Sequence, residues 1–208
     1  MARTVAVILA AGAGRRLGGL SKPLLRWNGR TLSGLAMQAA HDAGTEPLLV
    51  LGHRSDEVLG TLRAEEADLL SGTSVVHLQQ SCAMADSLQA GVHRAAEGAA
   101  DHVLLMLVDQ PSIGAAAARA VLAAHRRQRI TRGRIQGQPS HPVLLDTPDA
   151  LAAAALAVGD EGARRFLRQH EHRTTWVPLD GIAEAWDVDA PGDLKRLRGG
   201  AAGRCAAE

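Results

Sequence analysis

Aromatic residues are scarce in this sequence of 208 residues: they make up 2% of the chain, and tyrosine is absent. A core built from it must therefore consist mostly of Ala, Val and Leu. The two cysteines, Cys82 and Cys205, are too few for a disulfide framework or a cysteine zinc site. No run reaches the ~18 consecutive apolar residues of a membrane span. The first residues also lack the layout of a signal peptide, so we expect a cytoplasmic protein with no membrane partner.

The sequence also lacks an excess of one charge. Its formal net charge is +1, which provides no overall field that would attract nucleic acid. Hydrophobic residues make up 46% and charged residues 22%, an ordinary globular balance. The length suits one domain of ~100–200 residues. We predict a single domain over residues 1–198 and a disordered tail of small residues over 199–208.

Short apolar runs without alternation predict strands that are covered on both faces. Segments with helical spacing lie between them and follow them, and one of these opens with Thr31, a residue suited to cap a helix. This alternation predicts βαβ units in an α/β fold, a single-domain Rossmann-like three-layer αβα sandwich with a mainly parallel sheet. The predicted strands are residues 5–11, 47–52, 74–78 and 102–108, and the predicted helices are 31–43, 55–70, 86–96 and 113–128.

The second half of the chain has less regular patterns. Residues 126–138 are basic and rich in Gly and Gln, which indicates a connection or an edge strand. The arginines of this region could bind an anion or form a solvated face. Further along, 142–145 and 175–179 are strand candidates, and 149–158, 160–170 and 191–197 are helix candidates.

A glycine-rich loop with two cations follows the first predicted strand, in the order L-A-A-G-A-G-R-R-L-G-G-L-S-K-P-L-L from Leu9. Ligands of open α/β sheets bind at the carboxyl ends of strands. Backbone N–H groups beside glycines can surround phosphate oxygens, Arg16 can hold two oxygens in a fork, and Lys22 adds a mobile charge. The spacing fits neither a P-loop nor a dinucleotide fingerprint. The alternative is a flexible surface loop.

Acidic residues follow two later segments. Asp109 ends the run 103–108, and Asp187 opens the sequence D-V-D-A-P-G-D-L. Mg²⁺ prefers hard oxygen ligands, so Asp109 and Asp187 are the metal candidates. Alternatively, Asp109 starts an Asx turn, and the later acids, Asp189 above all, only cap the last helix.

The loop resembles the signature of the nucleotidyltransferase A superfamily, L-A-A/G-G-x-G-x-R-M-G-x-x-x-K-P-L, with Leu17 at the usual Met. The resemblance implies that the loop wraps a triphosphate, and that Arg16 and Lys22 stabilise charge on the α-phosphate and on the departing pyrophosphate. Together with Asp109 they form the implied catalytic set. The implied nucleotide-binding residues are Leu9, Ala10, Ala11, Gly12, Ala13, Gly14, Arg16, Lys22 and Ser87.

Three further stretches resemble motifs of one branch of that superfamily. They are S-H-P-V at 140–143, G-D-E-G-A-R at 159–164, and residues 83–91, which resemble the motif G-x-x-x-S-L-x-x-G. The branch contains molybdenum cofactor cytidylyltransferases and other MobA-like NTP transferases, and it implies acceptor-binding roles for His141, Asp160 and Arg164. Each residue has a structural alternative: His141 in a turn, Asp160 as a helix cap and Ser87 as a helix-start residue. The sequence departs from the motifs at Ala83, Ser140, Ala190 and Gly192.

The resemblance implies a Mg²⁺-dependent enzyme that transfers CMP from CTP to the molybdenum cofactor, molybdopterin, and releases pyrophosphate. A molybdenum hydroxylase would receive the product. In this branch L-A-A-G, found here at 9–12, goes with cytidine and L-A-G-G with guanosine. The alternatives are a guanylyltransferase using GTP, another NTP transferase with a phosphorylated acceptor, and a non-catalytic carrier of the cofactor.

Overall fold

A seven-stranded, mainly parallel sheet forms the centre of the computed structural model, which describes residues 2–12, 14–79 and 83–199. The strand order is β5-β4-β1-β6-β8-β7-β9, and β8 runs antiparallel to both of its neighbours. A separate two-stranded hairpin, β2-β3, lies beside the sheet. The strands are β1 Thr4–Ala10, β2 Arg26–Trp27, β3 Arg30–Thr31, β4 Glu46–Leu51, β5 Ser74–His77, β6 His102–Leu107, β7 Ile130–Ile135, β8 Gln138–Asp146 and β9 Thr174–Pro178.

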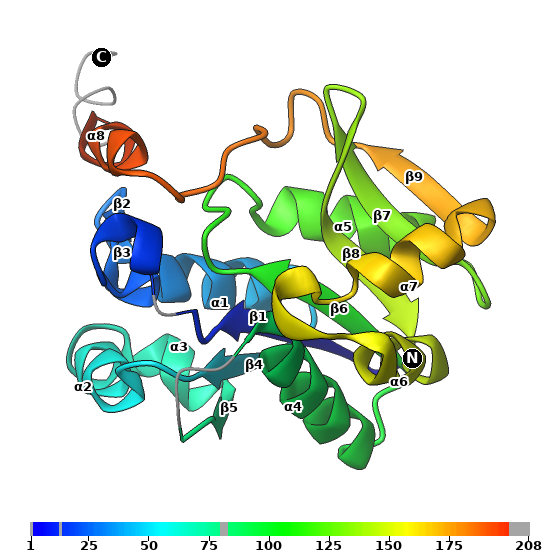
Figure 1. Ribbon diagram of the computed structural model, residues 1–208, viewed down its shortest axis with the longest axis horizontal. Helices are drawn as coiled ribbons and strands as arrows, with labels where there is room; N and C mark the ends of the chain where they lie inside the picture. The colour runs from blue at the N-terminus through cyan, green and yellow to red at the C-terminus, as the bar shows by residue number, and fades with distance from the viewer. Residues whose placement is uncertain (1, 13, 80–82, 200–208) are drawn as a thin grey trace.

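Helices cover both faces of this sheet. Figure 1 shows α1 and α5 on one side and α4 and α6 on the other. The helices are α1 Leu32–Asp42, α2 Ser55–Glu65, α3 Ala67–Ser71, α4 Met84–Glu97, α5 Ala115–Ala124, α6 Thr147–Leu156, α7 Arg164–Gln169 and α8 Pro191–Gly199, and the short 3₁₀ turns are η1 Arg15–Leu17, η2 Lys22–Leu24, η3 Gly159–Glu161 and η4 Glu171–Arg173.

Two buried clusters, one on each face of the sheet, confirm the predicted three-layer sandwich. One joins the sheet to α1, α2 and α5, and the other joins it to α4, α6 and α7. Both consist mainly of Ala, Val, Leu and Ile, as the shortage of aromatics requires. Central strands buried on both faces explain why their sequences show apolar runs without alternation.

The predicted helix 55–70 is two helices, because Glu66 interrupts it. The Glu66 carboxylate is buried, and it accepts hydrogen bonds from the backbone N–H (2.9 Å) and the hydroxyl (3.0 Å) of Thr31. Thr31 also caps α1 as predicted, since its Oγ1 accepts from the N–H of Gly34. A buried carboxylate needs such partners, and turning Glu66 inward ends α2.

The basic segment 126–138 contains β7, which is an interior strand of the sheet and neither a connection nor an edge. It pairs with β8 on one side and with β9 on the other, and β9 forms the edge. Strand β8 begins at Gln138, earlier than its apolar part predicted. The first residues of β8 are polar, so the apolar pattern indicated only the second part of the strand.

The predicted last helix is present as α8. Of the predicted tail only Gly199 is described, as the end of α8; the rest of the tail and both cysteines lie outside the described residues. Among the residues that the structure describes, no helix is both long enough and apolar enough to cross a membrane.

Gly91 allows α4 to approach the sheet closely. We therefore predict that alanine has opposite effects on stability at Gly91 and at Gly60, a helical glycine with open space around it. A Cβ at Gly91 would overlap the Cγ1 atom of Val7 and lie 2.9 Å from Cγ2 of Val50, whereas a Cβ at Gly60 of α2 would meet nothing within 4 Å. We expect Gly91→Ala to lower the free energy of unfolding by ~1–3 kcal/mol through overpacking. Gly60→Ala should raise it by ~0.5–1 kcal/mol through helix propensity.

Urea unfolding followed by circular dichroism measures both variants against the wild type. Equal effects of the two substitutions would contradict the close packing of α4 at Gly91.

Candidate active site

A cavity of about 630 Å³ opens beyond the carboxyl ends of β1 and β6. These two strands are adjacent and parallel, so the loops that follow them leave the sheet side by side. The cavity brings together most of the residues that the sequence predicted for the site. Its lining includes Leu9, Ala10, Ala11, Gly12, Gly14, Arg16, Lys22, Ser87, Asp109, Asp160, Arg164, Asp187 and Asp189.

The loop after β1 turns tightly at Gly14. Gly14 has φ +59°, and a Cβ there would overlap the carbonyl oxygen of Leu20. Its own carbonyl accepts hydrogen bonds from the N–H groups of Leu17 and Gly19, at 2.9 and 3.1 Å. Gly12 is exposed, with open space around its α-carbon, so a ligand can approach the backbone there. Ala13, which was predicted to bind nucleotide, lies outside the described residues.

Ala11 lines the cavity but is almost fully buried. A Cβ at Gly52, just after β4, would lie 2.9 Å from the Ala11 methyl group. The methyl group therefore fills the space above Gly52 and fixes the position of the loop backbone.

The ammonium group of Lys22 joins two acidic segments. Its Nζ donates to Oδ2 of Asp109 at 2.8 Å and to Oδ1 of Asp189 at 2.5 Å. Burial lowers the pKa of Lys22, but the two carboxylates more than offset this and hold the pKa above its ordinary value. Lys22 is therefore a fixed positive charge in a mostly buried position.

Asp187 reaches the cavity because Val188 anchors its segment. The Val188 side chain is fully buried, and its N–H donates to the carbonyl of Asp109 at 2.9 Å. The Asp187 carboxylate accepts from Nε2 of Gln110 at 2.8 Å. Burial raises the pKa of Asp187, and the negative charges of Asp109 and Asp189 raise it further, against the opposing effects of Gln110 and Lys22. A cation at this carboxylate would relieve that cost.

Asp189 does not cap the last helix, contrary to the sequence-based interpretation. Asp193 does this instead, since its carboxylate accepts from the N–H groups of Asp189 and Ala190 at 3.0 and 2.7 Å. The Asp189 side chain binds Lys22 and lies 3.8 Å from the Arg16 guanidinium. The signal for this was the D-V-D spacing around a buried valine, because residues two apart in extended chain point the same way.

Three carboxylates with different exposures thus border the cavity: Asp109, Asp187 and Asp189. They offer hard oxygen ligands, the kind that Mg²⁺ and Mn²⁺ prefer. The raised pKa of Asp187 and the surplus of negative over fixed positive charge fit a divalent cation there. Arg16, whose side chain is 83% exposed, is free to reach a bound anion.

The opposite wall comes from the start of α4 and from η3. Ser87 is buried, and its hydroxyl is directed at the carbonyl of Ala83 in its own helix, at 3.4 Å. Asp160 does not cap α7; its Oδ1 lies 3.5 Å from the backbone nitrogen of Met84, the first residue of α4. Arg164, at the start of α7, also lines this wall.

His141 is not among the residues that line the cavity. It lies in β8, joined to Pro142 by a cis peptide bond, and so it is not in a turn. Burial lowers its pKa to about 3, and the charges of Arg132 and Arg164 contribute. His141 is thus a neutral imidazole near Arg164, behind the cavity wall.

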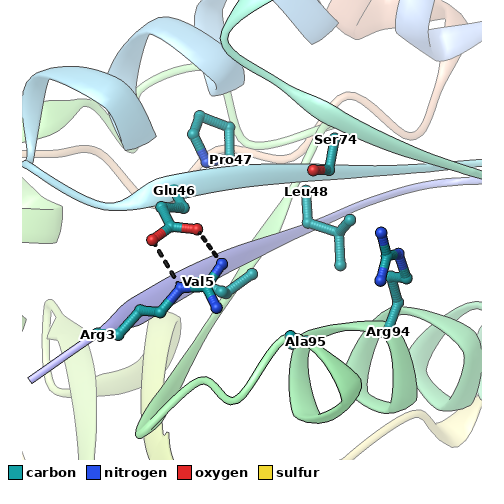
Figure 2. Close-up of a pocket in the computed structure, with 9 residues that line it drawn as sticks. Arg3, Val5, Glu46, Pro47, Leu48, Ser74, Arg94 and Ala95 are labelled. Atoms are coloured by element: carbon teal, nitrogen blue, oxygen red, sulfur yellow. Dashed lines mark hydrogen bonds and ion pairs between the residues drawn. The ribbon is translucent and has the colours of Figure 1, made fainter.

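A second, smaller hollow of about 80 Å³ lies near the opposite ends of β1 and β4. Figure 2 shows Arg3 and Glu46 facing each other across it, with bonds of 2.7 Å from Nε and 2.6 Å from a terminal nitrogen of Arg3. The two charges pair with each other, and Arg94 is the one further charged residue in the lining of this hollow. The larger cavity is therefore the candidate active site.

Comparisons with known proteins agree with this geometry. Residues 6–174 match the model of the MobA-like NTP transferase domain. The chain is 33% identical over 199 residues to nicotine blue oxidoreductase of Paenarthrobacter nicotinovorans, covering 92% of this chain and 94% of that protein. It also resembles the crystal structure of Rv0371c from Mycobacterium tuberculosis, with a TM-score of 0.77 and 29% identity over 94% of this chain and 97% of that one.

A second crystal structure of Rv0371c, a complex with manganese, gives a TM-score of 0.75 at 28% identity, with the same coverage of both chains. The family match covers most of the chain and includes the loop, the strand before Asp109 and the wall formed by α4 and η3. The chain therefore belongs to the MobA-like NTP transferase family and is a nucleotidyltransferase.

Proposed function

We propose that the protein transfers CMP from CTP to the molybdenum cofactor with the help of Mg²⁺ and releases pyrophosphate. One observation carries this proposal: a phosphate-binding type of loop, two cations and three carboxylates meet in one cavity large enough for a nucleotide. The motifs at 83–91 and 159–164, which resemble those of cytidylyltransferases, form the opposite wall.

The loop after β1 would bind the triphosphate. Gly12 and Gly14 have no Cβ, so phosphate oxygens can approach their backbone N–H groups. Arg16 can bind phosphate oxygens in a fork. Asp109 and Asp187 would hold the divalent ion, and the manganese complex of Rv0371c supports a divalent metal in this family. Such an ion, when bound, supplies positive charge beside the phosphate oxygens.

The chemistry is one in-line displacement. A terminal phosphate oxygen of the acceptor forms a bond to the α-phosphorus of CTP, and the bond from that phosphorus to the bridging oxygen of the β-phosphate breaks. Both electrons leave with pyrophosphate, so no covalent enzyme intermediate is needed. Lys22 and Arg16 would stabilise the charge that develops on the α-phosphate and the leaving group.

The wall formed by α4, η3 and α7 would bind the acceptor. Arg164 supplies positive charge for its phosphate, with Asp160 beside it. His141 stays uncharged because of its lowered pKa. It would act through its position beside Arg164, and direct contact with the acceptor would require the wall to open. A molybdenum hydroxylase would then receive the product.

Ala11 would bear on the choice of base. Its methyl group occupies space beside Gly52. We expect this to leave less room for the base, which favours the smaller pyrimidine over guanine. GTP as donor is the alternative within the same chemistry.

The relative named nicotine blue oxidoreductase favours a second candidate, a redox reaction on nicotine blue, because this chain is 33% identical to it. The two candidates differ in their products. The first releases pyrophosphate from a nucleoside triphosphate, and the second changes the oxidation state of nicotine blue and consumes an added electron donor or acceptor. A pure carrier of the molybdenum cofactor would do neither.

We expect pyrophosphate release and a cofactor product heavier by one CMP when the wild type is incubated with molybdenum cofactor, Mg²⁺ and CTP. Lys22→Ala and Asp109→Asn should each lower kcat about 10²–10³-fold, as the loss of a charge-stabilising group does elsewhere. The matched control is Lys195→Ala, because Lys195 is an exposed lysine of α8 outside the cavity. Mass spectrometry of the product and a pyrophosphate assay give the readout.

Full turnover by either variant would refute the assigned roles. Absence of pyrophosphate with every nucleoside triphosphate, together with turnover of nicotine blue in the presence of an added electron donor or acceptor, would favour the redox candidate.

Nucleotide preference is measured separately by thermal unfolding. In the presence of Mg²⁺, CTP at 100 times its Kd should stabilise the folded protein by about 2.7 kcal/mol, and GTP at the same concentration by less. Ala11→Gly, which removes the methyl group above Gly52, should narrow the difference between the two nucleotides. A larger stabilisation by GTP in the wild type would assign guanylyl transfer instead.

A further inference from the structure

Two histidines and an aspartate meet at the end of the sheet opposite the active site. His102 is the first residue of β6, Asp146 is the last residue of β8, and the two are directly paired in the sheet. His125 follows α5 and joins them. Strand β6 leads from His102 to Asp109 at ~3.3 Å per residue, so this cluster lies roughly 20 Å from the proposed magnesium ligands.

The three side chains direct their ligand atoms at one point. Nε2 of His125 lies 3.0 Å and Nε2 of His102 lies 3.4 Å from the same carboxylate oxygen, Oδ1 of Asp146. All three atoms lie within 4.8 Å of one another. A tetrahedral zinc ion with bonds of ~2.0–2.1 Å separates its ligand atoms by ~3.3 Å. The two nitrogen–oxygen separations are already close to that spacing, and the two nitrogens lie within 4.8 Å of each other.

We propose that His102, His125 and Asp146 form a second metal site, which binds Zn²⁺ or a similar borderline transition metal. Two imidazole nitrogens and one carboxylate oxygen are a usual zinc ligand set, whereas Mg²⁺ takes oxygen ligands almost alone. The ion would therefore differ from the one at Asp109 and Asp187. A water or a further small ligand would complete its coordination.

Neighbouring groups already orient two of the ligands through hydrogen bonds, as they do at known metal sites. Nδ1 of His125 lies 2.9 Å from Oγ1 of Thr131, and the other oxygen of Asp146 accepts from the N–H of Gln128 at 2.7 Å. With a metal bound, the His125 ring would carry its proton on Nδ1 and donate to Thr131. This leaves the lone pair of Nε2 for the ion.

The surroundings permit a divalent cation. Burial, with help from His125 and Arg127, lowers the pKa of His102 against the opposing effect of Asp146 and Asp101. Asp101 adds negative charge next to the site and Arg127 adds positive charge. The His102 and Asp146 side chains are 18% and 19% exposed, while that of His125 is 7% exposed. The three side chains are thus mostly buried, and two of them retain some contact with solvent.

The ion would connect three segments that are distant in sequence: the start of β6, the end of β8 and the link between α5 and β7. It would thereby hold the antiparallel β7-β8 pair on the parallel half of the sheet. Metal binding would add to stability without entering the active site.

Zinc titration of the metal-free full-length protein tests the proposal, with excess Mg²⁺ present to occupy oxygen-only sites. We expect about one Zn²⁺ per chain, a higher melting temperature with zinc, and a tetrahedral visible absorption band when Co²⁺ replaces it. The double variant with His102→Gln and Asp146→Asn should lose this binding. Thr131→Val should weaken it about 10–100-fold, because His125 loses its orienting partner.

Two controls separate this site from others. His93→Gln changes an exposed histidine of α4, and Asp187→Asn changes the proposed magnesium site; both should bind zinc as the wild type does. Circular dichroism verifies that each variant is folded, and the milder His102→Gln alone replaces the double variant if that one is not. Failure of the wild type to retain zinc, or equal retention by the variants of His102, would overturn the proposal.

Discussion

The buried ammonium of Lys22, held between Asp109 and Asp189, is the interaction on which the active site depends. Its partners are 87 and 167 residues away in the sequence, so one side chain connects the first loop, the central strand and the C-terminal segment. Three carboxylates this close would repel one another without a cation, and Asp187 already shows that cost in its raised pKa. In the free protein, Lys22 supplies the charge that allows the acidic half of the cavity to form. The same charge lies where a triphosphate would need it.

The sheet makes this meeting possible. Because β1 and β6 are adjacent and parallel, the segments that follow them, which carry Lys22 and Asp109, lie at the same end of the sheet. The third partner, Asp189, belongs to the C-terminal segment before α8. The buried side chains of Val188 and Trp186 anchor this segment next to the cavity. Trp186 packs edge-on against Trp27 of the β2-β3 hairpin, with ring centroids 5.6 Å apart. In a chain with so few aromatics, this pair fixes the otherwise irregular C-terminal segment on the body of the domain (Figure 1).

Sequence reasoning predicted the fold where the physical signal is local and failed where it is not. The parallel strands are buried on both faces and therefore appear as apolar runs, and Thr31 signals its cap by residue type alone. The interior position of β7 was missed because its arginines resemble a solvated surface, while in the sheet Arg132 and Arg134 lie over the ring of Trp176 in β9. That contact joins residues about 40 apart, and no local pattern reports it. The same limit applies to Asp189, whose partner Lys22 is at the other end of the chain.

The two halves of the cavity present different chemical groups. One half bears on the type of reaction, and the other bears on the choice of acceptor. The half with Gly14, Lys22 and Asp109 is made of charges and a tight backbone turn, a lining that suits a polyanion together with a cation, as the proposed reaction requires. The half at α4 and η3 is made of a helix start, a buried hydroxyl and the exposed Arg164, which many phosphorylated acceptors could satisfy. The departures from the family motif at Ala83 and Ser140 lie at that wall and behind it. If the proposed function holds, substitutions at α4, η3 and β8 would change the choice of acceptor, while the residues proposed to bind the triphosphate stay as they are.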